Sequence, residues 1–109
     1  MSLRIVEAEP AIADIDDVTD YLLEKGGPDV ALRFLEAVKR VEELVASMPG
    51  IGALRDFGDP ELIGMRMLPI PRFPKYLLYY RATDQFLVVF RVIHGAQVQE
   101  RAFHNPGQS

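Results

Sequence analysis

Residues 76–95 read YLLYYRATDQFLVVFRVIHG and contain two apolar runs separated by a short polar stretch. The polar stretch, Ala82–Gln85, has the length and composition of a hairpin turn. The runs on either side therefore predict two antiparallel strands, the first over Tyr76–Arg81. The second run is almost continuously apolar over Phe86–Phe90, which is typical of a strand buried on both faces. This stretch predicts a hairpin whose second strand lies inside a sheet.

Two amphipathic helices precede this hairpin. The first begins near Ala11 and ends at the pair Gly26-Gly27, where a glycine suits the helix cap. Pro28 suits the first turn of the second helix, which ends at the corner Pro49–Gly52. The apolar positions expected on the buried face of the first helix are Ile12, Ile15, Val18 and Leu22. The short connection predicts a helical hairpin.

Shorter segments complete the predicted fold. Leu3–Glu7 indicates a first strand, Ala53–Gly64 a loop, and Met65–Leu68 the strand that precedes the hairpin. We therefore expect an α+β fold of order β-α-α-β-β-β, with an N-terminal strand, an α-helical hairpin and a C-terminal antiparallel meander. The helical hairpin is expected to cover one face of the sheet.

Length and composition limit the class of protein. A length of 109 residues suits one domain, which we place at residues 1–104, followed by a flexible polar tail at 105–109. The chain has no cysteine and only two histidines, which excludes cysteine chemistry and the usual zinc sites. No apolar run approaches the roughly 20 residues that span a bilayer. Because the first residues also lack the apolar region of a signal peptide, we expect a cytoplasmic protein.

Charge is distributed unevenly along the chain. Residues 1–64 carry six Lys/Arg and fourteen Asp/Glu, a balance of −8, whereas residues 65–109 carry six and two, a balance of +4. The helices are thus predicted to be acidic and the sheet basic. Such asymmetry suits an oppositely charged partner, and a solvated surface without a role is the alternative.

An ordered set of short motifs resembles the RelE/ParE toxin superfamily from residue 3 to about residue 100. The motifs are Gly26-Gly27-Pro28, Pro49–Gly52, Arg66, Phe73-Pro74, Tyr79-Tyr80-Arg81 and Arg91–Gly95. The last of them is more similar to the ParE branch than to RelE. The resemblance implies a type II toxin that is neutralised by a cotranscribed antitoxin. ParE proteins act on DNA gyrase, whereas RelE proteins cut messenger RNA on the ribosome.

The same resemblance implies the partners. We expect a ParD-like antitoxin that binds through an acidic C-terminal segment, and DNA gyrase as the target whose inhibition blocks replication. Promoter DNA is expected to be contacted only through the antitoxin, since this chain has a formal charge of −4. No cofactor and no membrane are implied. The alternatives are a RelE-like ribosome-dependent endoribonuclease and a non-toxic relative that only binds its antitoxin.

A RelE-like ribonuclease would need a base and cations around the charged phosphorus centre of its substrate. The candidates for these roles are Arg66, Arg81 and His94. His94 has a structural alternative, because a histidine at the end of a buried strand is more often held by hydrogen bonds than used as a base.

The expected hairpin register argues against such a site. If Thr83-Asp84 is the tip, opposed residues have numbers that sum to 167, which places Arg91 opposite Tyr76. Arg81 and His94 then share the other face of the sheet. On this register the functional-looking residues do not converge, although a bulge would reverse the faces. We therefore predict no catalytic residue.

The predicted antitoxin- or target-binding residues are Arg66, Arg81, Arg91, Tyr80 and Arg101. Each has a structural alternative. Arg91 lies within an apolar run, so it either pairs with an acidic residue of a helix or opens onto a groove. Tyr80 is either a binding residue or a core aromatic whose hydroxyl reaches the rim.

Four aspartates in the first helix have the residue types of a metal site: Asp14, Asp16, Asp17 and Asp20. Their position early in a helix, where negative charge is favourable, explains them without a metal. We therefore expect no metal site.

Overall fold

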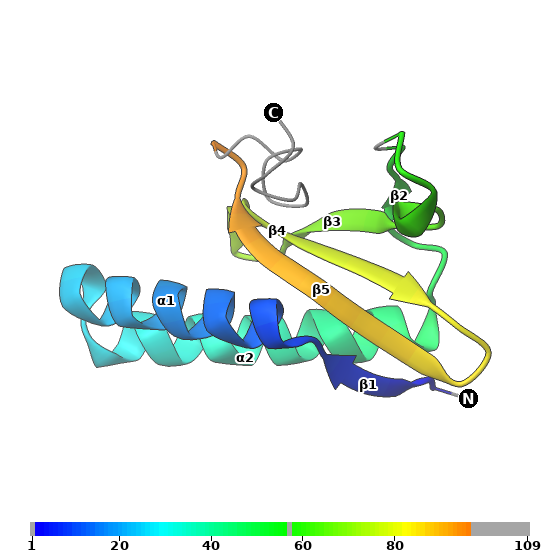
Figure 1. Cartoon of the computed structure of the whole chain (residues 1–109). Coiled ribbons are helices and arrows are strands. Elements are labelled where there is room, and N and C mark those ends of the chain that lie inside the picture. The colour runs from blue at the N-terminus through cyan, green and yellow to red at the C-terminus, as the bar shows by residue number, and fades with distance from the viewer. Residues whose placement is uncertain (1, 57, 97–109) are drawn as a thin grey trace.

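The computed structural model describes residues 2–56 and 58–96. The elements are β1 (Arg4–Glu7), α1 (Glu9–Gly26), α2 (Pro28–Ser47), β2 (Ala53–Leu54), the 3-10 turn η1 (Pro60–Leu62), β3 (Arg66–Ile70), β4 (Phe73–Ala82) and β5 (Phe86–His94). The predicted α+β order is confirmed, with a two-residue strand added inside the segment predicted as a loop. The two helices lie side by side on one side of the sheet (Figure 1).

The helical hairpin turns at a single glycine. Gly27 has a φ of +87°, a conformation that side chains with a Cβ rarely adopt, and Pro28 begins α2 directly after it. Ala11 and Ile15 of α1 are buried, whereas Ile12, predicted to be buried, is exposed. Within residues 2–56 and 58–96, no helix is both long and apolar enough to cross a membrane.

The described strands form one sheet in the order β1-β5-β4-β3-β2. β1 runs parallel to β5, and all other neighbours are antiparallel. β5 therefore has a strand on each side, as its apolar sequence predicts. β3 continues through Pro69 to Ile70, beyond the predicted end at Leu68, and β2 pairs only with Arg66 and Met67 of this strand. Pro69 thus lies on an open edge, where a missing N–H is tolerated.

The tip of the β4–β5 hairpin lies one residue later than predicted. Thr83 closes the turn, since its N–H donates to the Phe86 carbonyl at 2.8 Å and its Oγ1 accepts from the Phe86 N–H at 3.0 Å. Asp84 and Gln85 therefore form the tip, and Ala82 pairs with residue 87. The sum of opposed numbers becomes 169 rather than 167, a shift that leaves the same residues on the same face.

A bulge then changes the register again. It lies where the pairing shifts between Tyr79 and Tyr80, and beyond it Arg91 lies opposite Tyr79. The predicted pairing of Arg91 with Tyr76 is therefore wrong, and the partner of Tyr76 is His94. One extra residue inverts the faces of everything beyond it, which short-range turn chemistry does not reveal.

Each face of the sheet carries an apolar cluster. The larger one packs against both helices and contains Ala11, Ile15, Phe34, Ala37, Val38, Val41, Val45, Ala46, Ile70, Leu78, Tyr80, Leu87, Val89 and Val92. The smaller one contains Met65, Leu77, Tyr79 and Ile93. Because successive residues of a strand point to opposite faces, Tyr79 and Tyr80 belong to different clusters.

A carboxyl group is buried between the helices and the sheet. Glu42 of α2 is only 6% exposed and forms a hydrogen bond with Glu7 of β1. Its Oε2 has no hydrogen-bond partner within the described part of the chain. Burial, followed by the hydrogen bond and the charges of Glu7 and Glu43, raises the pKa of Glu42 from 4.5 to about 9. Glu42 therefore keeps its proton at neutral pH.

This carboxyl group makes stability fall as pH rises. Between pH 4.5 and about 9 the folded chain holds the Glu42 proton and the unfolded chain releases it, so the free energy of unfolding decreases across that window. We expect Glu42→Gln, which keeps a donor but cannot ionise, to stabilise the fold at pH 8 by about 1–2 kcal/mol. The difference should shrink towards pH 5.

Urea unfolding midpoints at pH 5 and pH 8 measure this effect. Glu36→Gln is the matched control, because Glu36 is an exposed glutamate on the same helix and is not among the groups that raise the pKa of Glu42. A Glu42→Gln variant whose stability follows pH as steeply as the wild type would show that Glu42 is not the titrating group.

Candidate functional site

Tyr80 and Arg66 hold the corner that follows α2. The Gly52 N–H donates to Tyr80 Oη at 2.9 Å, and Tyr80 Oη donates to the Pro49 carbonyl at 2.7 Å. Arg66 Nη1 donates to the carbonyl of Gly52 at 2.8 Å and more weakly to that of Gly50 at 3.4 Å. Burial raises the pKa of Tyr80, while the Gly52 bond and the Arg66 charge oppose the shift. The Tyr80 side chain is fully buried. Of the two roles considered for Tyr80, the structure therefore shows the core aromatic.

Arg81 lies on the face of the sheet opposite Tyr80. Its guanidinium carbon is 5.4 Å from the centre of the Phe90 ring, within the range of a cation–π contact. Its Nη1 also donates to the Ile63 carbonyl at 3.3 Å. Arg81 thus connects β4 to the loop that precedes β3.

Arg91 pairs with Asp14 of α1. Arg91 Nε lies 2.7 Å from Asp14 Oδ2 and Nη2 lies 2.9 Å from Oδ1, and the Val92 N–H also donates to Oδ2 at 3.0 Å. The hydrogen bond to Asp14 raises the pKa of Arg91, with burial opposing it. β1 pairs with β5 only as far as Val89. Beyond that point, the Asp14 carboxylate accepts the Val92 N–H that no described neighbouring strand binds on this side. The structural alternative, a pair with an acidic helix residue, is confirmed.

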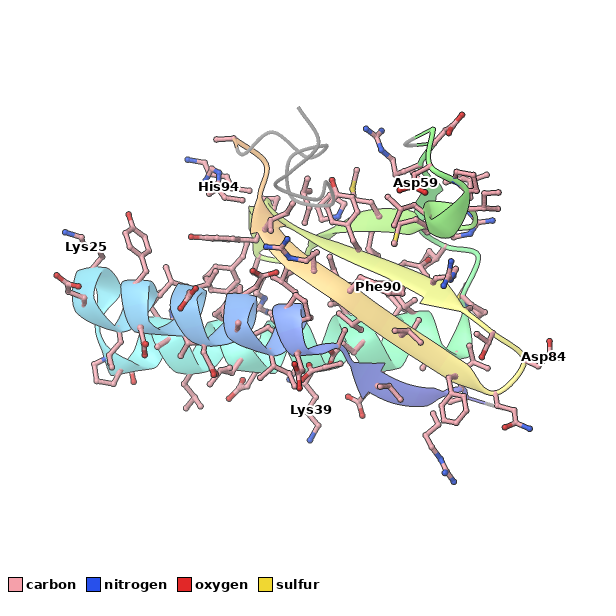
Figure 2. All side chains as sticks on the ribbon, viewed as in Figure 1. Lys25, Lys39, Asp59, Asp84, Phe90 and His94 are labelled. Atoms are coloured by element: carbon pink, nitrogen blue, oxygen red, sulfur yellow. The ribbon has the colours of Figure 1, made fainter. Side chains whose placement is uncertain are left out.

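His94 lies at the other end of β4 from Arg81. Its ring meets Tyr76 edge-on at 5.2 Å, and its Nδ1 accepts a hydrogen bond from the Ala96 N–H at 3.0 Å. An accepting Nδ1 places the proton of a neutral imidazole on Nε2. The labelled position of His94 in Figure 2 is far along the sheet from the hairpin tip at Asp84.

The three candidates for RNA cleavage are therefore separated. Arg66 is opposite Tyr80, and Arg81 points to the other face. His94 is opposite Tyr76, five residues from Arg81 along β4, or about 16 Å at roughly 3.3 Å per residue. The predicted sharing of a face by Arg81 and His94 is wrong because of the bulge. Arg101 lies outside the described residues.

Two open hollows were not predicted from the sequence. The α1–β5 hollow has a volume of about 400 Å³, and Asp17, Tyr21, Tyr76 and His94 are among its lining residues. Tyr21 is 53% exposed. The sequence feature that could have indicated the α1–β5 hollow is Tyr21, an aromatic residue next to the apolar stripe of an otherwise acidic helix.

The second hollow, the β2 hollow, lies beside the edge strand and has a volume of about 450 Å³. Its lining includes Leu54 and Ile63, which are 63% and 71% exposed, together with Asp56 and Asp59. Arg81 binds the carbonyl of Ile63 and therefore lies next to this hollow. Exposed apolar residues around a hollow are typical of an interaction surface.

Comparison with solved structures shows the same fold elsewhere. A chain of the chromosomal ParDE TA system from P. aeruginosa matches with a TM-score of 0.69 and 20% sequence identity, over 85% of this chain and 96% of that one. No curated protein matches the chain.

The matching family model is described as the ParE toxin of the type II toxin–antitoxin system, parDE, and it covers residues 5–99. The chain belongs to this family. The resemblance inferred from the ordered motifs is thereby confirmed.

Proposed function

We propose that the chain is the toxin of a type II pair, that a ParD-like antitoxin neutralises it, and that DNA gyrase is its target in the cytoplasm. The observation that carries the proposal is the ParE family match over residues 5–99. The ParDE system that shares the fold supports an antitoxin as the partner.

The geometry supports a toxin that acts by binding rather than by cutting RNA. Phosphoryl chemistry needs its base and cations around one reacting phosphate. Arg66 and Arg81 point to opposite faces of the sheet, and His94 lies at the other end of β4 from both. One phosphate does not reach all three in this arrangement.

The antitoxin contacts divide into direct and indirect ones. Arg66 and Arg81 bind backbone carbonyls through the guanidinium contacts described above, and we place both at the surface that meets the antitoxin's carboxylates directly. Leu54 and Ile63 supply the apolar surface beside Arg81. Tyr80 and Arg91 contribute to antitoxin binding indirectly. Tyr80 holds the corner at Pro49–Gly52, and Arg91 holds α1 against β5 through its pair with Asp14.

We expect Arg81→Gln to weaken binding of the antitoxin about fivefold to twentyfold, because a rim charge facing carboxylates contributes roughly 1–2 kcal/mol. Isothermal titration calorimetry with the purified pair measures the change. Lys25→Gln is the matched control, with the same loss of charge at the far end of α1, where Figure 2 shows Lys25. Equal losses in both variants would mean that only overall charge matters.

The function is tested by producing the chain without its antitoxin, followed by parallel assays of DNA breakage by purified gyrase and of messenger RNA cleavage on ribosomes. Gyrase-dependent DNA breaks with intact message are the expected result. Cleaved message with intact DNA would overturn the gyrase proposal in favour of RelE-like activity. Neither effect, with antitoxin binding retained, would identify a non-toxic relative.

A further inference from the structure

A third hollow lies between α2 and the turn that joins β3 to β4. It has a volume of about 110 Å³ and is lined by Arg33, Glu36, Ala37, Arg40, Pro71 and Arg72. The α2 residues are spaced three, four and seven apart, which places them on one face of the helix. Ala37 leaves room between the longer side chains. This α2 hollow is separate from Arg66, Arg81 and Arg91.

The α2 hollow gathers positive charge. Three arginines and one glutamate give a formal balance of +2, although Arg33 and Arg40 come from residues 1–64, whose overall balance is −8. Within the described part of the chain, the three guanidinium groups make no ion pair or hydrogen bond. Like charges that gather without a partner repel one another, and an anion between them removes that repulsion.

The backbone of Arg72 adds an independent observation. Pro71 and Arg72 form a two-residue turn between the paired residues Ile70 and Phe73, and Arg72 has a φ of +73°. A turn with proline first and a positive φ second favours glycine or asparagine at the second position. Arginine is strained there, and this strained conformation places a third guanidinium at the hollow.

We propose that the α2 hollow binds a phosphate group. Guanidinium groups present several donors in a fixed fork that matches phosphate oxygens, and a phosphate monoester carries about −1.5 to −2 charge at pH 7. The formal balance of +2 matches this charge. The hollow is well below the roughly 300–1,000 Å³ of sites that enclose drug-sized ligands, so it holds the phosphate alone and leaves any attached group outside.

The test uses the full chain and inorganic phosphate at pH 8, with sodium chloride adjusted so that ionic strength is constant. We expect phosphate to raise the melting temperature, because a ligand that binds only the folded state stabilises it. Arg33→Gln/Arg40→Gln should weaken phosphate binding at least tenfold by calorimetry. Lys39→Gln is the matched control, since Lys39 is on the same helix and points away from the sheet (Figure 2).

Arg72→Gly separates binding from folding. It should raise the melting temperature without phosphate, because glycine accepts the positive φ, and lower the gain on adding phosphate. No gain in the wild type, an unchanged gain in any of the arginine variants, or an equal loss in Lys39→Gln would overturn the proposal.

Two further probes identify the source of the phosphate. A nucleoside 5′-monophosphate that binds more tightly than inorganic phosphate assigns a nucleotide, and equal binding assigns the phosphate group alone. Succinate, a dicarboxylate, should give less than a tenth of the phosphate affinity. Equal affinity for succinate would overturn the assignment and point to an acidic peptide.

Discussion

Replacing Asp14 with alanine is expected to lower the free energy of unfolding by about 2–4 kcal/mol. The Asp14 carboxylate accepts two hydrogen bonds from Arg91 and one from the Val92 N–H. The variant removes this partner from Arg91, whose side chain is only 23% exposed, and it leaves the Val92 N–H without its acceptor. Urea unfolding followed by circular dichroism measures the loss.

Asp17→Ala is the matched control, because Asp17 is an exposed aspartate one turn further along α1. Its effect should stay within about 0.5 kcal/mol. In a double-mutant cycle with Arg91→Met, the two losses should be non-additive by at least about 1 kcal/mol. Equal losses for Asp14→Ala and Asp17→Ala would show that the pair contributes nothing specific.

Replacing Gly52 with alanine is expected to cost about 2–3 kcal/mol of stability, as overpacking of a filled site does. A Cβ at this position would lie 2.7 Å from Tyr80 Oη and 2.8 Å from Cε1, and 3.1 Å from the Met67 carbonyl oxygen. Tyr80 has no room to yield, since its hydroxyl is held by both Gly52 and Pro49.

Gly50→Ala tests whether the space at Gly52 is the cause. A Cβ at Gly50 meets nothing within 4 Å, so this variant should be neutral or slightly stabilising. Tyr80→Phe should cost about 1–2 kcal/mol by removing the hydroxyl that pairs with Gly52 and Pro49. In that background Gly52→Ala should cost less, because the nearest clashing atom is gone. A full loss in both backgrounds would place the clash elsewhere.

The residues in both predictions have roles in the structure that differ from those predicted from the sequence. Asp14 belonged to an aspartate cluster explained by its position early in the helix, and Arg91 had two open alternatives. Their pairing joins residues 77 positions apart in the chain, a separation at which local patterns carry no information. Tyr80 and Arg66 were predicted at a binding surface, and the structure uses both to hold the corner at Pro49–Gly52.

Local chemistry was sufficient for the elements of this fold. The spacing of apolar residues, the Gly27-Pro28 connection and the polar turn after Arg81 predicted the helical hairpin and the β4–β5 hairpin within a few residues. These features depend on neighbours in the chain, because helix caps, proline and turn residues act over three or four positions.

Only the tertiary structure decided which side chains meet. The bulge at Tyr79/Tyr80 inverts the faces of the last residues of β5, so it separates Arg81 from His94. Packing of α1 against the free edge of β5 brings Asp14 to Arg91. The position of a bulge and a contact between distant elements both depend on the whole packed core. The sequence by itself therefore determined the helices and strands, and the tertiary structure decided which of their side chains are in contact.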